Sequence, residues 1–154
     1  MTEDFKERLV GTNIDPNSLL STDYFNHFNE VIMLFSMMAD APELLDEVDK
    51  WNYITYREHF KQSGLGFADL AIEAYETAPF QVRERFEKIA TEMSMLVVET
   101  RVRLRQYLEQ GDMARFADMA MLNSMQLQGM VDDGASVVHG RSASMDQSAI
   151  DAMF

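Results

Sequence analysis

Residues 79–131 read PFQVRERFEKIATEMSMLVVETRVRLRQYLEQGDMARFADMAMLNSMQLQGMV, and this stretch decides the fold. Large side chains recur in it at intervals of three and four residues, which places them on one face of an α-helix. The positions in the first part of the stretch are Val82, Phe86, Ile89, Met93, Leu96, Thr100, Leu104 and Tyr107. Gly111 is suited to end one helix and Asp112 to start the next. The sequence therefore predicts an antiparallel hairpin of two helices, 79–110 and 112–131.

Four shorter helices are predicted ahead of this hairpin, over residues 22–39, 42–51, 56–63 and 67–77. The clearest boundary signal is the spacing of Thr55 and Glu58, which permits a capping box, with Gly64 at the other end of the helix. Ser21 or Thr22 can cap the first of the four helices. Strand-like alternation of apolar and polar residues is missing. We therefore predict an all-α fold, a helical bundle of five to six helices with a long antiparallel C-terminal hairpin.

The composition restricts the class of protein. A chain of 154 residues that is 47% hydrophobic and 10% aromatic can fill the core of one domain, which argues against wholesale disorder. The absence of cysteine excludes disulfides, thiolate metal sites and cysteine nucleophiles. The formal net charge of −13 argues against nucleic acid as a partner, because binding to phosphates requires clustered Lys and Arg.

The sequence also bears on the compartment. The first ten residues, MTEDFKERLV, carry charges from the third position onward and do not resemble a signal peptide. The longest apolar stretches, VIMLFSMMA and MSMLVV, are too short to span a bilayer. We therefore expect a cytoplasmic protein that does not insert into membranes.

Changes in composition divide the chain into four predicted segments. Residues 1–21 are expected to form a loose or weakly helical N-terminal arm, and residues 22–133 the helical bundle domain. Small and polar residues over 134–143 are typical of a flexible tether. Apolar residues return over 144–154, and this last segment is predicted to be a docking peptide that forms a helix.

The docking prediction rests on the pattern within SMDQSAIDAMF. Ser144 and Gln147 have capping-box spacing, so a helix can begin there. Ile150, Met153 and Phe154 then fall at i, i+3 and i+4 and form one apolar edge. A helix this short is not stable alone in water, so the apolar edge requires a groove, either on a partner or on the protein itself.

The segment DQSAIDAMF resembles the docking peptides of bacterial chemotaxis. It is similar to the N-terminal segment of the flagellar motor switch protein FliM, whose pattern is near SQxEIDALL, and more loosely to the C-terminal peptide of the phosphatase CheZ. The resemblance implies that this segment binds a CheY-like receiver domain or a flagellar switch component. The implied partner-binding residues are Gln147, Ile150, Asp151, Ala152, Met153 and Phe154.

The resemblance covers about nine residues and includes several departures from the family pattern. Ala149 stands where the pattern has Glu, and Met153-Phe154 stand where it has Leu-Leu. The alternative is that the segment packs as an ordinary terminal helix on its own bundle.

Enzymatic activity is uncertain, and a non-enzymatic role is favoured. A phosphatase of the CheZ type would offer Asp-x-x-x-Gln on a long helix, and no Asp in this chain has Gln four residues later. The nearest substitutes are Glu58 with Gln62, and the amides Asn123, Gln126 and Gln128. An amide can orient an attacking water without changing its own protonation.

No cofactor or metal site is predicted. A di-metal bundle needs two Glu-x-x-His motifs on facing helices, and the chain has none. His27 and His59 are expected to border the core. P-loop, dinucleotide and nucleophile motifs are also missing.

Three functional hypotheses follow: a chemotaxis or flagellar adaptor, a phosphatase of a receiver domain, and a small-ligand sensor. The third would use the aromatic cluster of Trp51, Tyr53 and Tyr56 near His59 and Phe60.

The methionine-rich helix 112–131 has two possible interpretations. Its methionines either fill the core or offer an adaptable surface for a protein partner, including a second copy in a homodimer. They are Met113, Met119, Met121, Met125 and Met130.

Overall fold

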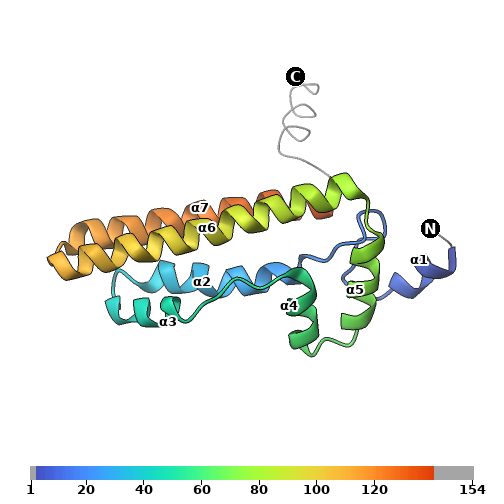
Figure 1. Ribbon diagram of the computed structural model, residues 1–154, viewed down its shortest axis with the longest axis horizontal. Coiled ribbons are helices and arrows are strands. Elements are labelled where there is room, and N and C mark those ends of the chain that lie inside the picture. Colours follow the sequence, from blue (N-terminus) through green and yellow to red (C-terminus); the bar gives the residue numbers. More distant parts are fainter. Residues whose placement is uncertain (1–2, 141–154) are drawn as a thin grey trace, which may run out of the picture. The chain divides into compact units, whose positions relative to one another are not determined.

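The computed structural model describes residues 3–140, and within this range the chain forms helices and no strands (Figure 1). The elements are α1 Glu3–Leu9, η1 Thr22–Phe25, α2 Asn26–Met37, η2 Pro42–Leu44, α3 Leu45–Asp49, α4 Tyr56–Ser63, α5 Ala68–Thr77, α6 Phe80–Gln110 and α7 Met113–Val138. The predicted all-α class is confirmed, and the seven α-helices of this range are close to the predicted five to six. None of them is both long and apolar enough to cross a membrane.

The chain divides into two compact units. Of the described residues, the first contains 3–24, 54–89 and 132–140, and the second contains 25–53 and 90–131. Helices α6 and α7 contribute residues to both units.

The first unit has an aromatic core around Tyr56. The ring of Tyr56 stacks on Tyr75 with 4.5 Å between centroids and contacts Tyr24 and Phe86 at 5.5 and 5.6 Å. Its hydroxyl oxygen accepts a hydrogen bond of 2.8 Å from the backbone N–H of Ser21. Burial raises the pKa of Tyr56 above its ordinary value, so the hydroxyl stays neutral at physiological pH.

The predicted capping box of α4 is confirmed. The hydroxyl of Thr55 accepts from the backbone N–H of Glu58 at 3.2 Å, and the carboxylate of Glu58 accepts from the backbone N–H of Thr55 at 3.1 Å. This backbone hydrogen bond lowers the pKa of Glu58. Gly64 ends the helix with φ of 71°, a left-handed conformation that glycine adopts without strain.

Residues 9–21 pack into the first unit and do not form the predicted loose arm. Leu9, Ile14 and Leu20 are buried. The turn between them is fixed by Asp15, whose carboxylate accepts from the backbone N–H groups of Asn17 and Ser18 at 2.8 and 3.0 Å. Leu9, Ile14 and Leu20 are not spaced at intervals of three or four residues. The sequence therefore shows no helical period here that would have predicted their burial.

Helix α7 is longer than predicted and runs to Val138. Gly134, Val137 and Val138 are buried, so burial continues the helix through residues 134–138 of the predicted tether. The rest of that tether beyond Gly140, and the whole predicted docking peptide 144–154, lie outside the described residues.

The second unit contains a hairpin of residues 90–131, with α2 lying along it (Figure 1). Gly111 reverses the chain with φ of 71°, as its position predicted. The hydroxyl of Ser124 on α7 donates to the carbonyl of Ile32 on α2 at 3.3 Å. The buried core side chains of this unit include Phe28, Phe35, Met93, Val97, Leu104, Phe116 and Leu127.

Replacing Tyr56 with Phe should lower the free energy of unfolding by about 1–3 kcal/mol, because the buried N–H of Ser21 loses its acceptor. Urea unfolding followed by circular dichroism measures this change. Tyr53→Phe is the matched control, since Tyr53 is 45% exposed and should tolerate loss of its hydroxyl with little change. Equal stability of the two variants would contradict the assigned role of Tyr56.

A candidate docking groove on helix α6

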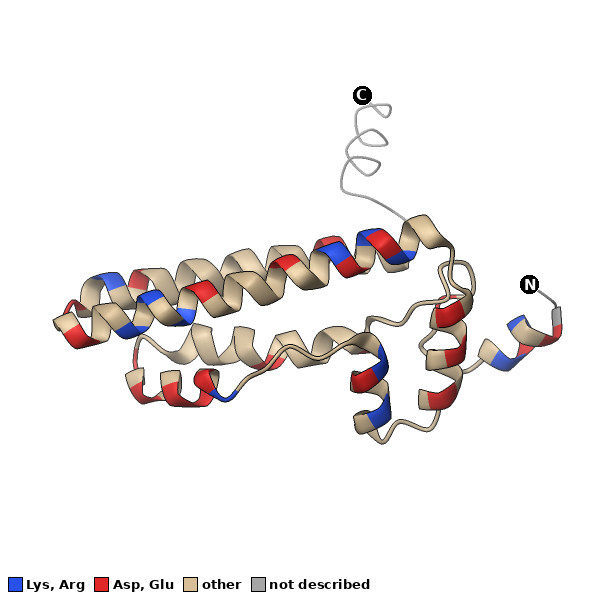
Figure 2. Cartoon of the chain, in the orientation of Figure 1, with Lys and Arg blue, Asp and Glu red and all other residues tan. Residues whose placement is uncertain are grey.

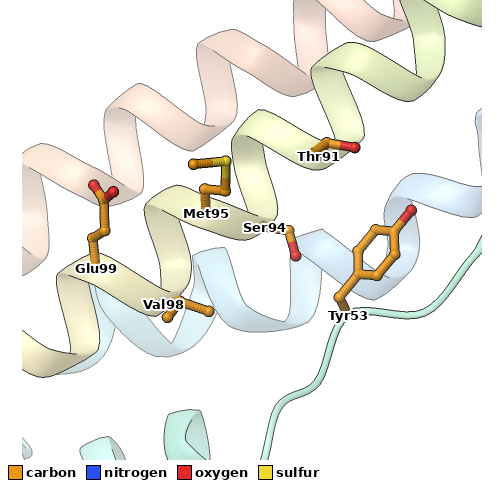
Figure 3. A pocket seen from close by; sticks show the side chains of 6 residues that line it. All are labelled: Tyr53, Thr91, Ser94, Met95, Val98 and Glu99. Atoms are coloured by element: carbon orange, nitrogen blue, oxygen red, sulfur yellow. The ribbon is translucent and has the colours of Figure 1, made fainter.

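A mainly apolar cavity of the second unit lies along α6. It has a volume of about 360 Å³ and is lined by Tyr53, Thr91, Ser94, Met95, Val98 and Glu99. Figure 3 shows the hydroxyl-bearing side chains toward one end of the cavity, Met95 and Val98 in its middle, and Glu99 at the other end. A site with this lining can hold an apolar group and offers a carboxylate to a cation beside it.

A second cavity of about 310 Å³ adjoins the first across α6. It is lined by Glu92, Met95, Leu96, Glu99, Gln126 and Met130. Because Met95 and Glu99 line both cavities, the two form one surface that crosses α6 and reaches α7. We call this combined surface, the residues that line the two cavities, the α6 groove.

The apolar side chains of this surface are exposed to solvent. Met95 is 57% exposed and Val98 44%, and Val102, which continues the same face of α6, is 54% exposed. Burying such side chains against a partner is favourable by about 25 cal/mol per Å² of apolar surface removed from water. The charged residues of the lining are Glu92 and Glu99, both acidic.

The loop that carries Tyr53 is held by its neighbours in the second unit. The indole N–H of Trp51 donates to the carbonyl of His27 at 2.9 Å, and the Nε2 of His27 lies 2.5 Å from the carbonyl oxygen of Asn52. The rings of His27 and Trp51 also stack, with 4.7 Å between centroids. These contacts fix the backbone directly before Tyr53.

Arg101 on α6 ties the same loop to the helix. Its guanidinium donates to the carbonyl of Trp51 at 2.8 Å and to that of Val48 at 3.3 Å. One turn further along, Arg105 pairs with Asp46 at 3.1 Å and also with Asp49. The hydrogen bonds that its guanidinium donates to the carboxylates of Asp49 and Asp46 raise the pKa of Arg105. The sequence did not reveal these contacts, because the partners lie 50 or more residues away along the chain.

Methionine side chains contribute much of the exposed apolar surface of the second unit. The exposed methionines are Met33, Met37, Met95, Met113, Met121 and Met125. Met119 and Met130 are half-buried. Residues 119–131 of α7 carry no charge at all, as Figure 2 shows. These positions favour the surface interpretation of the methionine-rich helix over the core interpretation.

The residues predicted to bind a partner or to act in a phosphatase do not lie together in one described site. The predicted partner-binding residues, Gln147, Ile150, Asp151, Ala152, Met153 and Phe154, lie outside the described residues. Of the candidate amides, Gln126 lines the α6 groove, while Asn123 is buried and donates to the carbonyl of Met119 at 2.9 Å. Glu58 serves the capping box of α4.

The predicted aromatic cluster is divided between the two units. Trp51 is buried in the second unit against Phe28, at 5.4 Å between ring centroids. His59 contacts Tyr24 and Phe60 edge-on in the first unit, at 5.7 and 4.9 Å. Only Tyr53 of the predicted cluster lines the α6 groove.

Within residues 3–140, no group of three or more His, Asp or Glu side chains is placed to hold a metal ion. Comparison with protein-family models, curated proteins and solved structures finds no match to this chain. The interpretation of the site therefore rests on its own geometry.

Replacing Arg101 with Ala should loosen the loop that carries Tyr53, because two backbone carbonyls lose their donor. We expect a loss of about 1–3 kcal/mol in unfolding free energy and stronger acrylamide quenching of the fluorescence of Trp51, the single tryptophan. Arg103→Ala, an exposed arginine on the same helix, should change neither. A quenching constant that stays the same in both variants would show that Arg101 does not hold the loop.

Proposed function

We propose that this protein is a non-enzymatic adaptor in chemotaxis or flagellar signalling. It recruits a CheY-like receiver domain or a flagellar switch component through residues 144–154. The observation that carries the proposal is the pattern of Ile150, Met153 and Phe154 on one helical edge beside Gln147 and Asp151, which resembles the docking peptides of that system.

The architecture of the described residues is compatible with a folded body to which residues 144–154 add a binding segment. Both units have filled cores made by residues between Leu9 and Val138. Deleting residues 144–154 leaves all of these core residues in the chain, so binding and stability can both be measured on the deletion variant.

Titrating the full chain with a fluorescently labelled receiver domain tests this proposal. We expect micromolar binding that strengthens when a beryllofluoride phosphoryl mimic is added, and an Ile150→Ala loss of roughly 10-fold or more, since a buried aliphatic side chain contributes about 1.5–3 kcal/mol. Ser148→Ala, a change away from the apolar edge, is the control.

Deleting residues 144–154 should abolish this binding and leave helical circular dichroism and the melting temperature nearly unchanged. A large loss of stability would instead assign the segment to packing on its own bundle. Undiminished binding by the deletion variant would place the receiver site elsewhere on the protein.

A second candidate function, phosphatase of a receiver domain, is favoured by one observation in the α6 groove. Gln126 on α7 lines the same cavity as Glu92 and Glu99 on α6, so an amide and two carboxylates from facing helices share one exposed site. The amide would orient a water that attacks the phosphorus of an aspartyl phosphate. The bond between phosphorus and the aspartate oxygen then breaks and inorganic phosphate leaves.

This candidate predicts faster loss of phosphate from a radiolabelled receiver at catalytic concentrations of the protein. Gln126→Ala should then slow the loss by 10-fold or more, and Gln128→Ala, an exposed amide on the same helix outside the groove, should not. Equal effects of the two variants, or no acceleration by the native protein, would reject the phosphatase.

A further inference from the structure

We propose that the α6 groove binds a basic amphipathic helix of a protein partner. This contact is separate from the one made by residues 144–154, so the protein would join two different molecules. The inference rests on the shape, the adaptability and the charge of the groove.

The shape of the groove suits a helix. Met95, Val98 and Val102 follow one another at intervals of three and four along α6 and cover about 10 Å of its length at 1.5 Å per residue. A row with this spacing forms a ridge that packs into the grooves of another helix. Tyr53, toward one end of the groove (Figure 3), adds an exposed ring with a polar tip that can contact apolar and polar groups of a partner.

The residue types of the groove suit a partner whose side chains need not fit one fixed shape. Met95 lies at the centre of the surface because it lines both cavities, and Met130 lines the second one. The unbranched thioether of methionine adapts its conformation to different apolar side chains. The hydroxyl of the buried Ser94 adds a hydrogen-bonding group within the apolar part.

The charge of the groove selects a cationic partner. Glu92 and Glu99 are the charged residues of its lining, and the protein as a whole carries −13. Arg101 and Arg105 lie on α6 nearby, but they are engaged with the loop after α3 and with α3 itself. Arg103 is an exposed cation further along α6, so the cationic side chains of the partner belong beside Glu99, which lines both cavities.

A second copy of this chain is a poorer occupant. It would bring the same two glutamates to the interface and a further charge of −13, and like charges placed together across an interface oppose association. A basic helix removes the same apolar surface from water and places a positive charge beside Glu99 at the same time.

Fluorescence anisotropy of a labelled peptide with the full chain tests the inference. The probe is a peptide of about 18 residues with Leu on one face and Lys on the other, and its comparison is the same peptide with Glu in place of Lys. We expect micromolar binding of the Lys peptide, at least 10-fold weaker binding of the Glu peptide, and unchanged affinity after deletion of residues 144–154.

The decisive comparison uses two double variants with the same chemistry and the same net charge. Met95→Gln with Glu99→Gln changes the α6 groove, and Met33→Gln with Glu30→Gln changes an exposed methionine and an exposed glutamate on α2. The first variant should bind the Lys peptide at least 10-fold more weakly, and the second less than 2-fold more weakly. Circular dichroism of both variants confirms that they are folded.

Three results would overturn the inference. Equal weakening by the two double variants would mean diffuse attraction to an acidic protein, and equal binding of the Lys and Glu peptides would mean nonspecific apolar association. A homodimer in sedimentation equilibrium that only the Met95→Gln, Glu99→Gln variant dissociates would make a second copy the occupant. The deletion of residues 144–154 removes none of the residues that line the groove, so the result for the groove and the result for receiver binding can be told apart.

Discussion

Burial of the inner face of α6 is the interaction on which the rest of the structure depends. Phe86, Met93, Val97 and Leu104 are almost fully buried along this one helix, which contributes residues to both compact units. Each such side chain favours folding by about 1.5–3 kcal/mol relative to exposure. The short helices α2, α3, α4 and α5 are too short to be stable alone, so packing must hold them.

The face of α6 opposite its buried residues is exposed to solvent. The exposed face of a surface helix carries mainly polar and charged residues, and a run of exposed apolar residues on one face often marks a binding surface. On α6 the outer face instead carries Met95, Val98 and Val102 between Glu92 and Arg103. Folding of the described residues does not require these exposed apolar groups. Their exposure is therefore the physical basis of the proposal that this face of α6 binds a partner.

Much of the fold was predictable because its signals are local. The hairpin was marked by apolar spacing and by Gly111, and helix α4 by the capping box of Thr55 and Glu58. The burial of residues 9–21 and the extension of α7 to Val138 depend on tertiary packing and have no local period. The α6 groove was missed for the same reason. Apolar residues at 93–98 suggest contact on two sides, and the sequence does not show that Met95 and Val98 are left exposed beside Tyr53.

The central claim is that the protein binds two molecules through two surfaces, residues 144–154 and the α6 groove. Methyl NMR spectra of the methionines in the full chain test it most directly, because Met145 and Met153 report on the first surface and Met95 and Met130 on the second. Addition of a phosphorylated receiver domain should shift the Met145 and Met153 signals, and addition of a basic amphipathic peptide should shift those of Met95 and Met130. The signals of Met33 and Met37 should stay in place in both titrations. A response of the same methyl groups to both molecules, or of none to either, would contradict the account.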